Sequence, residues 1–149
     1  NPGGADVGGD LGSWGSSVSE RLQEAQSLLE NDQQEMAAQN LRQLTEEIDA
    51  GSLLADEESA AKALYLSGTC ALDMNDLSQA KDAFSRVVKE FGEGPYMKPA
   101  MLHLGKVFHK AGKSDSAKAL YQKVIAIGSE DQWTDQAREM QQRIEVAHA

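Results

Sequence analysis

The chain has 149 residues, enough for one domain with a buried core, and carries a net charge of −10 at pH 7. It contains 40% hydrophobic and 5% aromatic residues, and it has no run of about 18 apolar residues that would predict a membrane-spanning helix. An acidic chain without a basic stripe is not expected to bind nucleic acid or an anionic membrane surface, because both interactions depend on cationic side chains that neutralise phosphate.

The first 16 residues, NPGGADVGGDLGSWGS, contain six of the 13 glycines and show no helical periodicity. We therefore expect residues 1–16 to form a flexible tether. The chain begins without a start methionine or a signal-peptide pattern, which indicates a processed or trimmed product. Any membrane attachment would then lie in a removed N-terminal segment.

Residues 18–48 are expected to form two antiparallel helices. Their apolar residues follow two stripes of helical spacing, which the turn residues Asn31 and Asp32 separate. The first stripe holds Leu22, Ala25, Leu28 and Leu29, and the second holds Met36, Leu41, Leu44 and Ile48. A longer connection follows over residues 49–59, in which Asp56 is the expected N-cap of the next helix.

An internal repeat with a period of 37 residues begins after this connection. Six pairs of matched residues preserve side-chain size: Leu64 with Met101, Gly68 with Gly105, Ala80 with Ala117, Phe84 with Tyr121, Val87 with Val124, and Val88 with Ile125. Asn75 falls on Gly112, and both residue types adopt the left-handed conformation of a turn between helices at low cost. We interpret the two paired glycines as close-contact points where helices cross, opposite the two paired alanines.

The last segment, EDQWTDQAREMQQRIEVAHA, is expected to form a capping helix over about residues 131–147. Trp133, Ala137, Met140 and Ile144 lie on its apolar face, and the opposite face is polar. A helical array needs such a polar face at its exposed end. We expect Trp133 to pack under the preceding hairpin.

No catalytic, metal or cofactor site is predicted. His103 and His109 are six residues apart on one expected helix and point in different directions, so they cannot share a metal ion. Cys70 has no neighbouring His or second Cys, which indicates a buried, inert thiol. The chain also lacks a phosphate-binding glycine-rich motif and a serine nucleophile elbow. We therefore expect a protein that is not an enzyme and uses no cofactor.

The repeated residues resemble the tetratricopeptide repeat family. The segment LYLSGTCALDMNDLSQAKDAFSRVV supplies Leu64, Gly68, Ala71, Ala80 and Phe84, and MLHLGKVFHKAGKSDSAKALYQKVI supplies Met101, Gly105, Phe108, Gly112, Ala117 and Tyr121. The first unit is degenerate, since Ala25, Leu28, Ala37 and Leu41 fit but Arg21 and Glu24 stand where apolar residues are usual. The resemblance implies an all-α fold, a right-handed α–α superhelix of about three helix hairpins plus a C-terminal capping helix. A single domain would cover residues 18–147, with units of about 18–51, 61–94 and 98–131.

A longer run, GPYMKPAMLHLGKVFHKAGKSDSAKALYQKVI, is most similar to tetratricopeptide domains of bacterial envelope proteins. These are the Tol–Pal-associated cell-division coordinator and related outer-membrane biogenesis proteins. The shared residues are Tyr96, Pro99, Ala100, Leu104 and Gly105. This chain lacks the coordinator's N-terminal coiled coil. The resemblance implies a tethered location in the bacterial periplasm or envelope, and a cytoplasmic location is the alternative.

The resemblance also implies that the first helix of each hairpin lines a concave groove that holds a protein partner. Its inward positions map to Gln26, Leu29, Lys62, Tyr65, Thr69, Leu72, Asp73, Leu102, Lys106, His109, Lys110 and Arg143. Tyr65 and Leu72 would supply apolar contact, and Thr69 a hydrogen bond. The basic residues between positions 106 and 110 would suit a peptide or helix that carries acidic groups or a terminal carboxylate.

The carboxylate clamp of the chaperone-binding members of this family is missing. Its positions hold Leu22, Gln26, Leu66, Pro99 and His103. A role as a co-chaperone of that kind is therefore not expected. The sequence instead predicts a non-catalytic scaffold for protein–protein interaction. The alternative from another class is a structural module that associates with itself into a homo-oligomer.

Overall fold

The computed structural model describes residues 18–147, which form seven helices and, within that range, no strand. A first helix covers residues 18–30. The others are α2 (Gln34–Asp49), α3 (Glu57–Asp73), α4 (Leu77–Glu90), α5 (Met97–Lys110), α6 (Ser114–Ala126) and α7 (Gln132–Ala147). The predicted tether over residues 1–16 lies outside the described residues.

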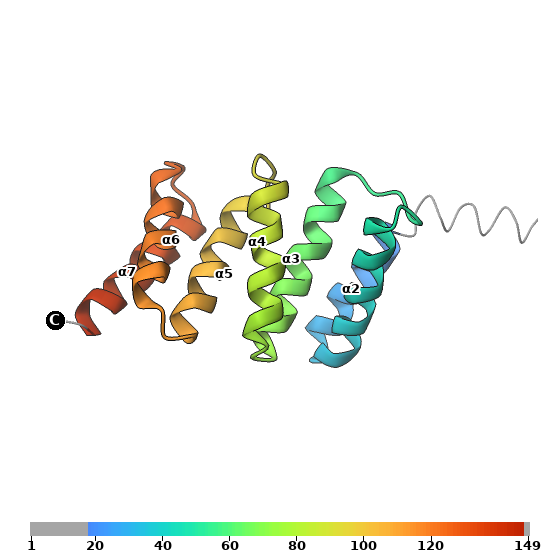
Figure 1. Cartoon of the computed structure of the whole chain (residues 1–149), viewed down its shortest axis with the longest axis horizontal. Coiled ribbons are helices and arrows are strands. Elements are labelled where there is room, and N and C mark those ends of the chain that lie inside the picture. Colours follow the sequence, from blue (N-terminus) through green and yellow to red (C-terminus); the bar gives the residue numbers. More distant parts are fainter. Residues whose placement is uncertain (1–17, 148–149) are drawn as a thin grey trace, which may run out of the picture.

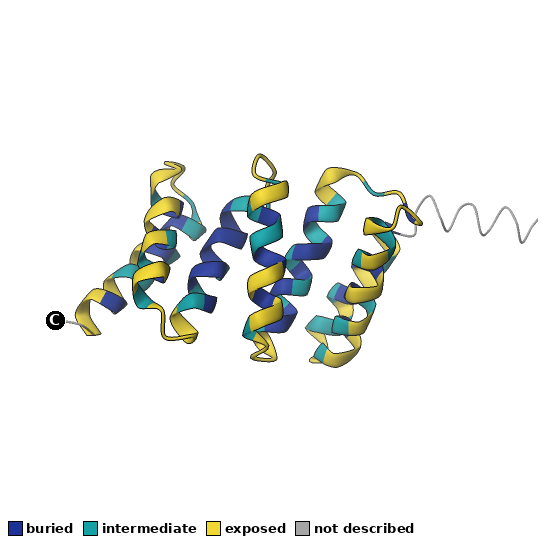
Figure 2. Ribbon diagram, in the orientation of Figure 1, coloured by how far each residue is buried: buried dark blue, intermediate teal, exposed yellow. Residues whose placement is uncertain are grey.

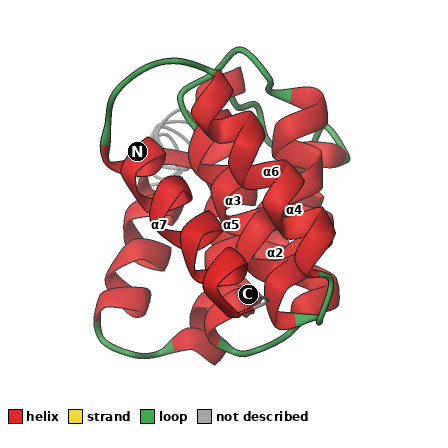
Figure 3. Ribbon diagram, turned by 90° about the vertical axis from the view of Figure 1, so that its left-hand side faces the viewer, coloured by secondary structure: helices red, strands yellow, loops and turns green. Residues whose placement is uncertain are grey.

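The helices stand side by side in one elongated row, each packed mainly against its neighbours in the chain (Figure 1). Successive helices run in opposite directions, so the connecting loops lie along the top and the bottom of the row (Figure 3). Helix α5 also contacts α7 and α3, which brings the first helices of successive hairpins together. These features confirm the predicted all-α superhelix of helix hairpins with a further helix at its C-terminal end.

The three hairpin turns share one conformation. Asp32, Asn75 and Gly112 have φ values of 60°, 60° and 82°, the left-handed region that the sequence predicted for the last two. The backbone bonds that close the turns are equivalent: Gln33 N–H to Leu28 O, Asp76 N–H to Ala71 O, and Lys113 N–H to Phe108 O, all at 2.8 Å. The first turn therefore precedes the second by 43 residues rather than 37, because α2 and α3 are longer than the equivalent helices α4 and α5 and the connection between them is also slightly longer.

That register places Ala25, Ala37 and Leu41 at the repeat positions that the sequence predicted, and all three are fully buried. The longer connection ends where Asp56 accepts a hydrogen bond from the Ser59 N–H at 2.7 Å, which confirms Asp56 as the N-cap of α3.

Gly68 and Gly105 are close-contact points, but the groups that they accommodate are aromatic rings rather than the predicted alanines. A Cβ atom on Gly68 would lie 2.6 Å from Cε1 of Phe84, and one on Gly105 would lie 2.5 Å from Cε1 of Tyr121. Real Cβ atoms do not approach other atoms this closely, so each glycine makes room for the ring of the following helix. In the first hairpin, Ala25 stands at the glycine position and the smaller Leu41 at the ring position.

The core runs along the array as three clusters, one for each hairpin and the helix that follows it. Helices α3 and α5 carry more of the buried residues than α2, α4 or α6, as the dark blue bands in Figure 2 show. Trp133 packs against the third cluster, which confirms its predicted place under the preceding hairpin. No helix in the described part of the chain combines the length and apolarity that crossing a bilayer requires.

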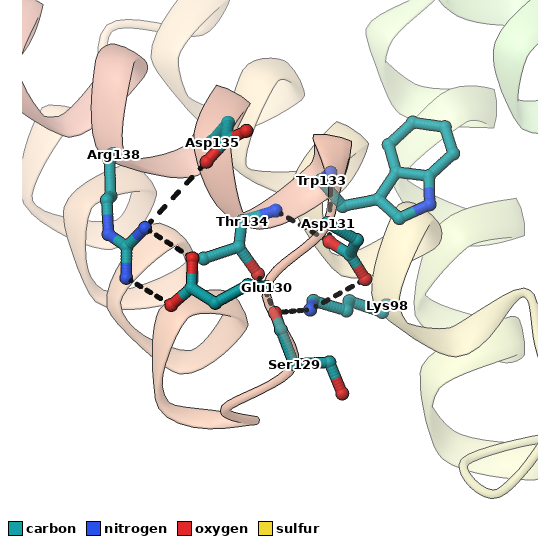
Figure 4. Close-up of polar contacts among 8 residues, drawn as sticks. All are labelled: Lys98, Ser129, Glu130, Asp131, Trp133, Thr134, Asp135 and Arg138. Carbon is teal, nitrogen blue, oxygen red and sulfur yellow. Dashed lines mark hydrogen bonds and ion pairs between the residues drawn. The ribbon is translucent and has the colours of Figure 1, made fainter.

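A polar network fixes the start of α7 against α5 (Figure 4). The buried Lys98 donates from Nζ to Ser129 O at 2.9 Å and to Asp131 Oδ2 at 3.0 Å. The other carboxylate oxygen of Asp131 accepts from the N–H groups of Trp133 and Thr134, both at 3.0 Å, so it caps the helix. The hydroxyl of Thr134 also donates to Ser129 O at 2.7 Å. This network holds the last helix in position to complete the groove.

Candidate functional site

A pocket of about 380 Å³ lies between α3, α5, α6 and α7. We call it the C-terminal groove pocket, and it is lined by Leu72, Asp73, Lys106, His109, Lys110, Tyr121 and Met140. Five of these are residues that the sequence assigned to the groove. Tyr121 and Met140 were assigned to packing, and the structure adds them to the lining. The sequence contained one indication that Tyr121 could belong to the site: its hydroxyl, which is absent from Phe84 at the equivalent position of the preceding repeat.

The C-terminal groove pocket is cationic in an acidic protein. Lys106 is half-buried, and its Nζ lies 3.4 Å from the neutral Oε1 of Gln136. Burial lowers the pKa of Lys106, because desolvation disfavours the charged ammonium. His109 and Lys110 are exposed on the last turn of the same helix, α5. Asp73 is exposed at the end of α3.

Tyr121 lines this pocket, and its hydroxyl is buried without a hydrogen-bond partner. Its side chain is fully buried because the ring crosses between α5 and α6 over Gly105. Burial raises the pKa of Tyr121 to about 12, so the hydroxyl remains a hydrogen-bond donor at neutral pH.

A second pocket, of about 280 Å³, lies between the first helix and α3. Its lining includes the predicted groove residue Lys62, together with Leu22, Glu58 and Tyr96. Gln26 and Leu29 lie half-buried on the first helix, and Leu29 packs against the first core cluster. Six of the twelve predicted groove residues line one of these two pockets, and the other six line neither.

Tyr65, a predicted groove residue that lines neither pocket, is half-buried in an aromatic cluster. Its hydroxyl is 3.0 Å from Nε2 of His103, and its ring centroid is 5.4 Å from that of Tyr96. Burial, and secondarily Tyr96, raises the pKa of Tyr65 to about 12. The imidazole of His103 stacks on Phe84 with ring centroids 5.5 Å apart. Tyr65 therefore joins α3 to α5.

His103 is a partly buried histidine on α5. Burial, and secondarily the charge of Lys106, lowers the pKa of His103 to about 4. Its Nδ1 is buried without a hydrogen-bond partner, so Nε2 makes its polar contact, to Tyr65. The imidazole acts here as a packing group.

Three predicted groove residues differ from expectation. Leu102 is fully buried and packs with Ala137 and Ile144 in the third core cluster, so assigning it to the groove surface was wrong. The side chain of Leu102 is too short to reach the surface between α5 and α7. The residue 37 positions earlier, Tyr65 on α3, is longer and remains partly exposed. The hydroxyl of Thr69 donates to Leu66 O at 3.0 Å within α3, so its proton is not free for a partner. Arg143 is paired with Glu139 one turn earlier on α7.

Cys70 is fully buried, which confirms the predicted position of its thiol. The Sγ atom donates to Gln34 O at 3.2 Å, and burial raises the pKa of the thiol. A protonated, covered thiol is not a nucleophile. Within residues 18–147, no three His, Cys, Asp or Glu side chains are grouped so that they could hold a metal ion.

Stacked helix hairpins, each packed against the next, define a helical-repeat protein. Comparison with protein families gives the repeat type: the tetratricopeptide repeat model matches residues 62–93 and 99–127. These two segments, which coincide with the hairpins α3–α4 and α5–α6, are tetratricopeptide repeats. Repeats of this type generally mediate protein–protein interaction. A search of curated proteins found no match to the chain.

Proposed function

We propose that this protein is a non-catalytic scaffold that binds a peptide or helix of a partner protein in its concave groove. The observation that carries the proposal is the C-terminal groove pocket. It combines the apolar Leu72 and Met140 with the basic Lys106 and Lys110, although the chain as a whole is strongly acidic. Such a surface fits an amphipathic segment with apolar and acidic side chains.

The binding mechanism is preformed complementarity. The lining comes from four helices, and these are held by the ring-over-glycine contacts and by the network at the start of α7. Because the groove is rigid, the scaffold loses little conformational entropy on binding, and most of the entropy loss comes from ordering the partner segment.

The proposed setting is a bacterial envelope complex in the periplasm, to which an N-terminal segment tethers the chain. Its support is the resemblance carried by the run from Tyr96 to Gly105. Fractionation of cells that produce the native protein tests this setting. Recovery with the periplasm or the envelope supports it, and recovery with the cytoplasm refutes it.

A peptide-display selection against the full chain tests the binding function. Random peptides are selected on the wild-type protein and then measured against Lys110→Glu and the matched control Lys89→Glu. Both lysines are exposed and undergo the same change of charge, but Lys89 lies on α4 and lines neither groove pocket. We expect at least a fivefold loss of affinity for Lys110→Glu and no loss for the control.

Equal binding by the two variants would place the interaction outside the groove. Sedimentation velocity over a range of concentrations tests the alternative of self-association. A species that grows with concentration would favour that alternative, and a monomer throughout would exclude it.

A further inference from the structure

The buried hydroxyl of Tyr121 is the feature that calls for a ligand. The ring is packed against Gly105, Tyr121 lines the C-terminal groove pocket, and its buried hydroxyl has no hydrogen-bond partner. Phe84 occupies the equivalent position of the preceding hairpin, so packing at this site does not require an oxygen. A buried hydroxyl without a partner lowers stability, and an acceptor supplied through the pocket would recover that loss.

The charges around the pocket indicate which acceptor fits. Lys106 is desolvated beside a neutral amide oxygen, whereas the other deeply placed lysine, Lys98, is neutralised by Asp131. Asp73 lines the pocket, but it forms no ion pair with Lys106 or Lys110 within the described residues. The pocket therefore offers one hydroxyl donor and two ammonium groups that form no ion pair with Asp73, the carboxylate in its lining.

The same space is filled one repeat earlier. There the imidazole of His103 stacks on Phe84, while the residue 37 positions later, Met140, lies in the pocket wall beside Tyr121. The thioether chain of Met140 and the butyl chain of Lys106 can both rotate. Their movement would open access to the hydroxyl oxygen without any change in the backbone.

We infer that the C-terminal groove pocket binds the carboxylate of a glutamate side chain of the partner segment, with Tyr121 as hydrogen-bond donor and Lys106 and Lys110 as the cationic partners. This inference rests on the proposed function and names the group that the groove holds. A glutamate side chain fits better than a chain terminus, because its carboxylate is carried on flexible methylene groups that can extend toward the buried hydroxyl of Tyr121. Leu72 and Met140 would contact the methylene groups of that stem.

Three acetylated tripeptides test the inference in an NMR titration of the ¹⁵N-labelled full chain. They are Ac-Leu-Glu-Leu-NH₂, its glutamine counterpart Ac-Leu-Gln-Leu-NH₂, and Ac-Leu-Gln-Leu-OH, which carries only a terminal carboxylate. We expect saturable shifts at the amides of Lys106, Lys110 and Met140 with the glutamate peptide. Binding of the glutamine peptide should be at least fivefold weaker, and added salt should reduce the difference.

The variant Tyr121→Phe removes only the hydroxyl and reproduces the residue of the preceding hairpin. We expect it to keep or raise the Tm and to weaken binding of the glutamate peptide at least threefold, with no effect on the glutamine peptide. A purely structural role for Tyr121 would leave both affinities unchanged.

Several results would overturn the inference: equal affinity for the glutamate and glutamine peptides, unchanged binding in Tyr121→Phe, or no saturable shift up to the solubility limit. Tighter binding of the terminal-acid peptide would refute the choice of a side chain. Displayed peptides that lack an acidic residue could still lose affinity in Lys110→Glu. That result would support the proposed groove-binding function and refute the carboxylate site.

Discussion

The substitution Gly68→Ala should destabilise this protein, although alanine is the better helix former. Gly68 is in the middle of α3, where its replacement by alanine would normally stabilise the helix by about 1 kcal/mol. Here the new Cβ atom would lie 2.6, 2.7 and 2.8 Å from three ring carbons of Phe84. The ring is fully buried and cannot move into solvent. Helix propensity and packing therefore act in opposite directions at this residue.

The magnitude follows from comparing these two effects. Adding a methyl group to a well-packed core costs about 1–3 kcal/mol, and the contact at Gly68 has to open by several tenths of an ångström at three atoms. After the gain in propensity, we expect a net loss of about 1–2 kcal/mol. For a domain of this size that corresponds to a fall in Tm of roughly 2–8 °C.

A double-mutant cycle with Phe84→Leu provides the control, because the first hairpin already has that combination. There Ala25 replaces the glycine and Leu41 replaces the ring, and both are fully buried. In the Phe84→Leu background, Gly68→Ala should become neutral or stabilising by up to about 1 kcal/mol. The expected coupling free energy is about 2 kcal/mol, within the range for residues in contact.

Urea denaturation followed by circular dichroism at 222 nm measures all four proteins of the cycle. The comparison requires a common m-value, since a changed m would indicate partial unfolding of the array. If Gly68→Ala stabilises the wild-type protein, or if the two substitutions are additive, the close-contact explanation of this glycine is wrong.

Two further predictions concern buried polar groups. The pKa of about 4 for His103 lies below its unfolded value of 6.5. Between these pH values the unfolded chain binds one more proton than the folded chain, so the free energy of unfolding decreases as the pH is lowered. We expect a loss of roughly 3 kcal/mol from pH 7 to pH 4, measured by urea denaturation, and a smaller loss in His103→Gln. Thr134→Val removes the hydroxyl that donates to Ser129 O. It should lower the free energy of unfolding by about 1 kcal/mol and speed amide hydrogen exchange in α7. Unchanged exchange would show that the Lys98 contacts hold the helix without this hydrogen bond.

The hairpins and their turns could be predicted from the sequence because they depend on local features. The turn residues Asn75 and Gly112 carry the left-handed conformation, and the period of 37 residues aligns everything between them. The first hairpin was less clear because six additional residues, spread over α2, the connection and α3, break the period. Its alanine and leucine also replace the glycine and the ring. The shared turn geometry at Asp32 restores the alignment.

The groove was only partly predictable, because exposure depends on what the following helix covers. Repeat position alone placed Tyr65 and Leu102 together on the surface, but α7 and its core cluster enclose Leu102. Position alone also treated Tyr121 and Phe84 as equivalent packing groups. The position of the Tyr121 ring over Gly105 and in the lining of the pocket is a property of the folded hairpin.

Packing and the proposed recognition meet at one contact of this array. The missing side chain of Gly105 makes room for the ring of Tyr121, and Tyr121 also lines the C-terminal groove pocket with Lys106 and Lys110. In the preceding hairpin, the ring of Phe84 packs in the same way against Gly68, and the imidazole of His103 stacks on it. Replacing Tyr121 by phenylalanine therefore removes one oxygen atom and keeps the packing of a ring over a glycine. The proposed carboxylate site can for this reason be tested separately from the fold, because a loss of glutamate binding at an unchanged or raised Tm would come from the hydroxyl alone.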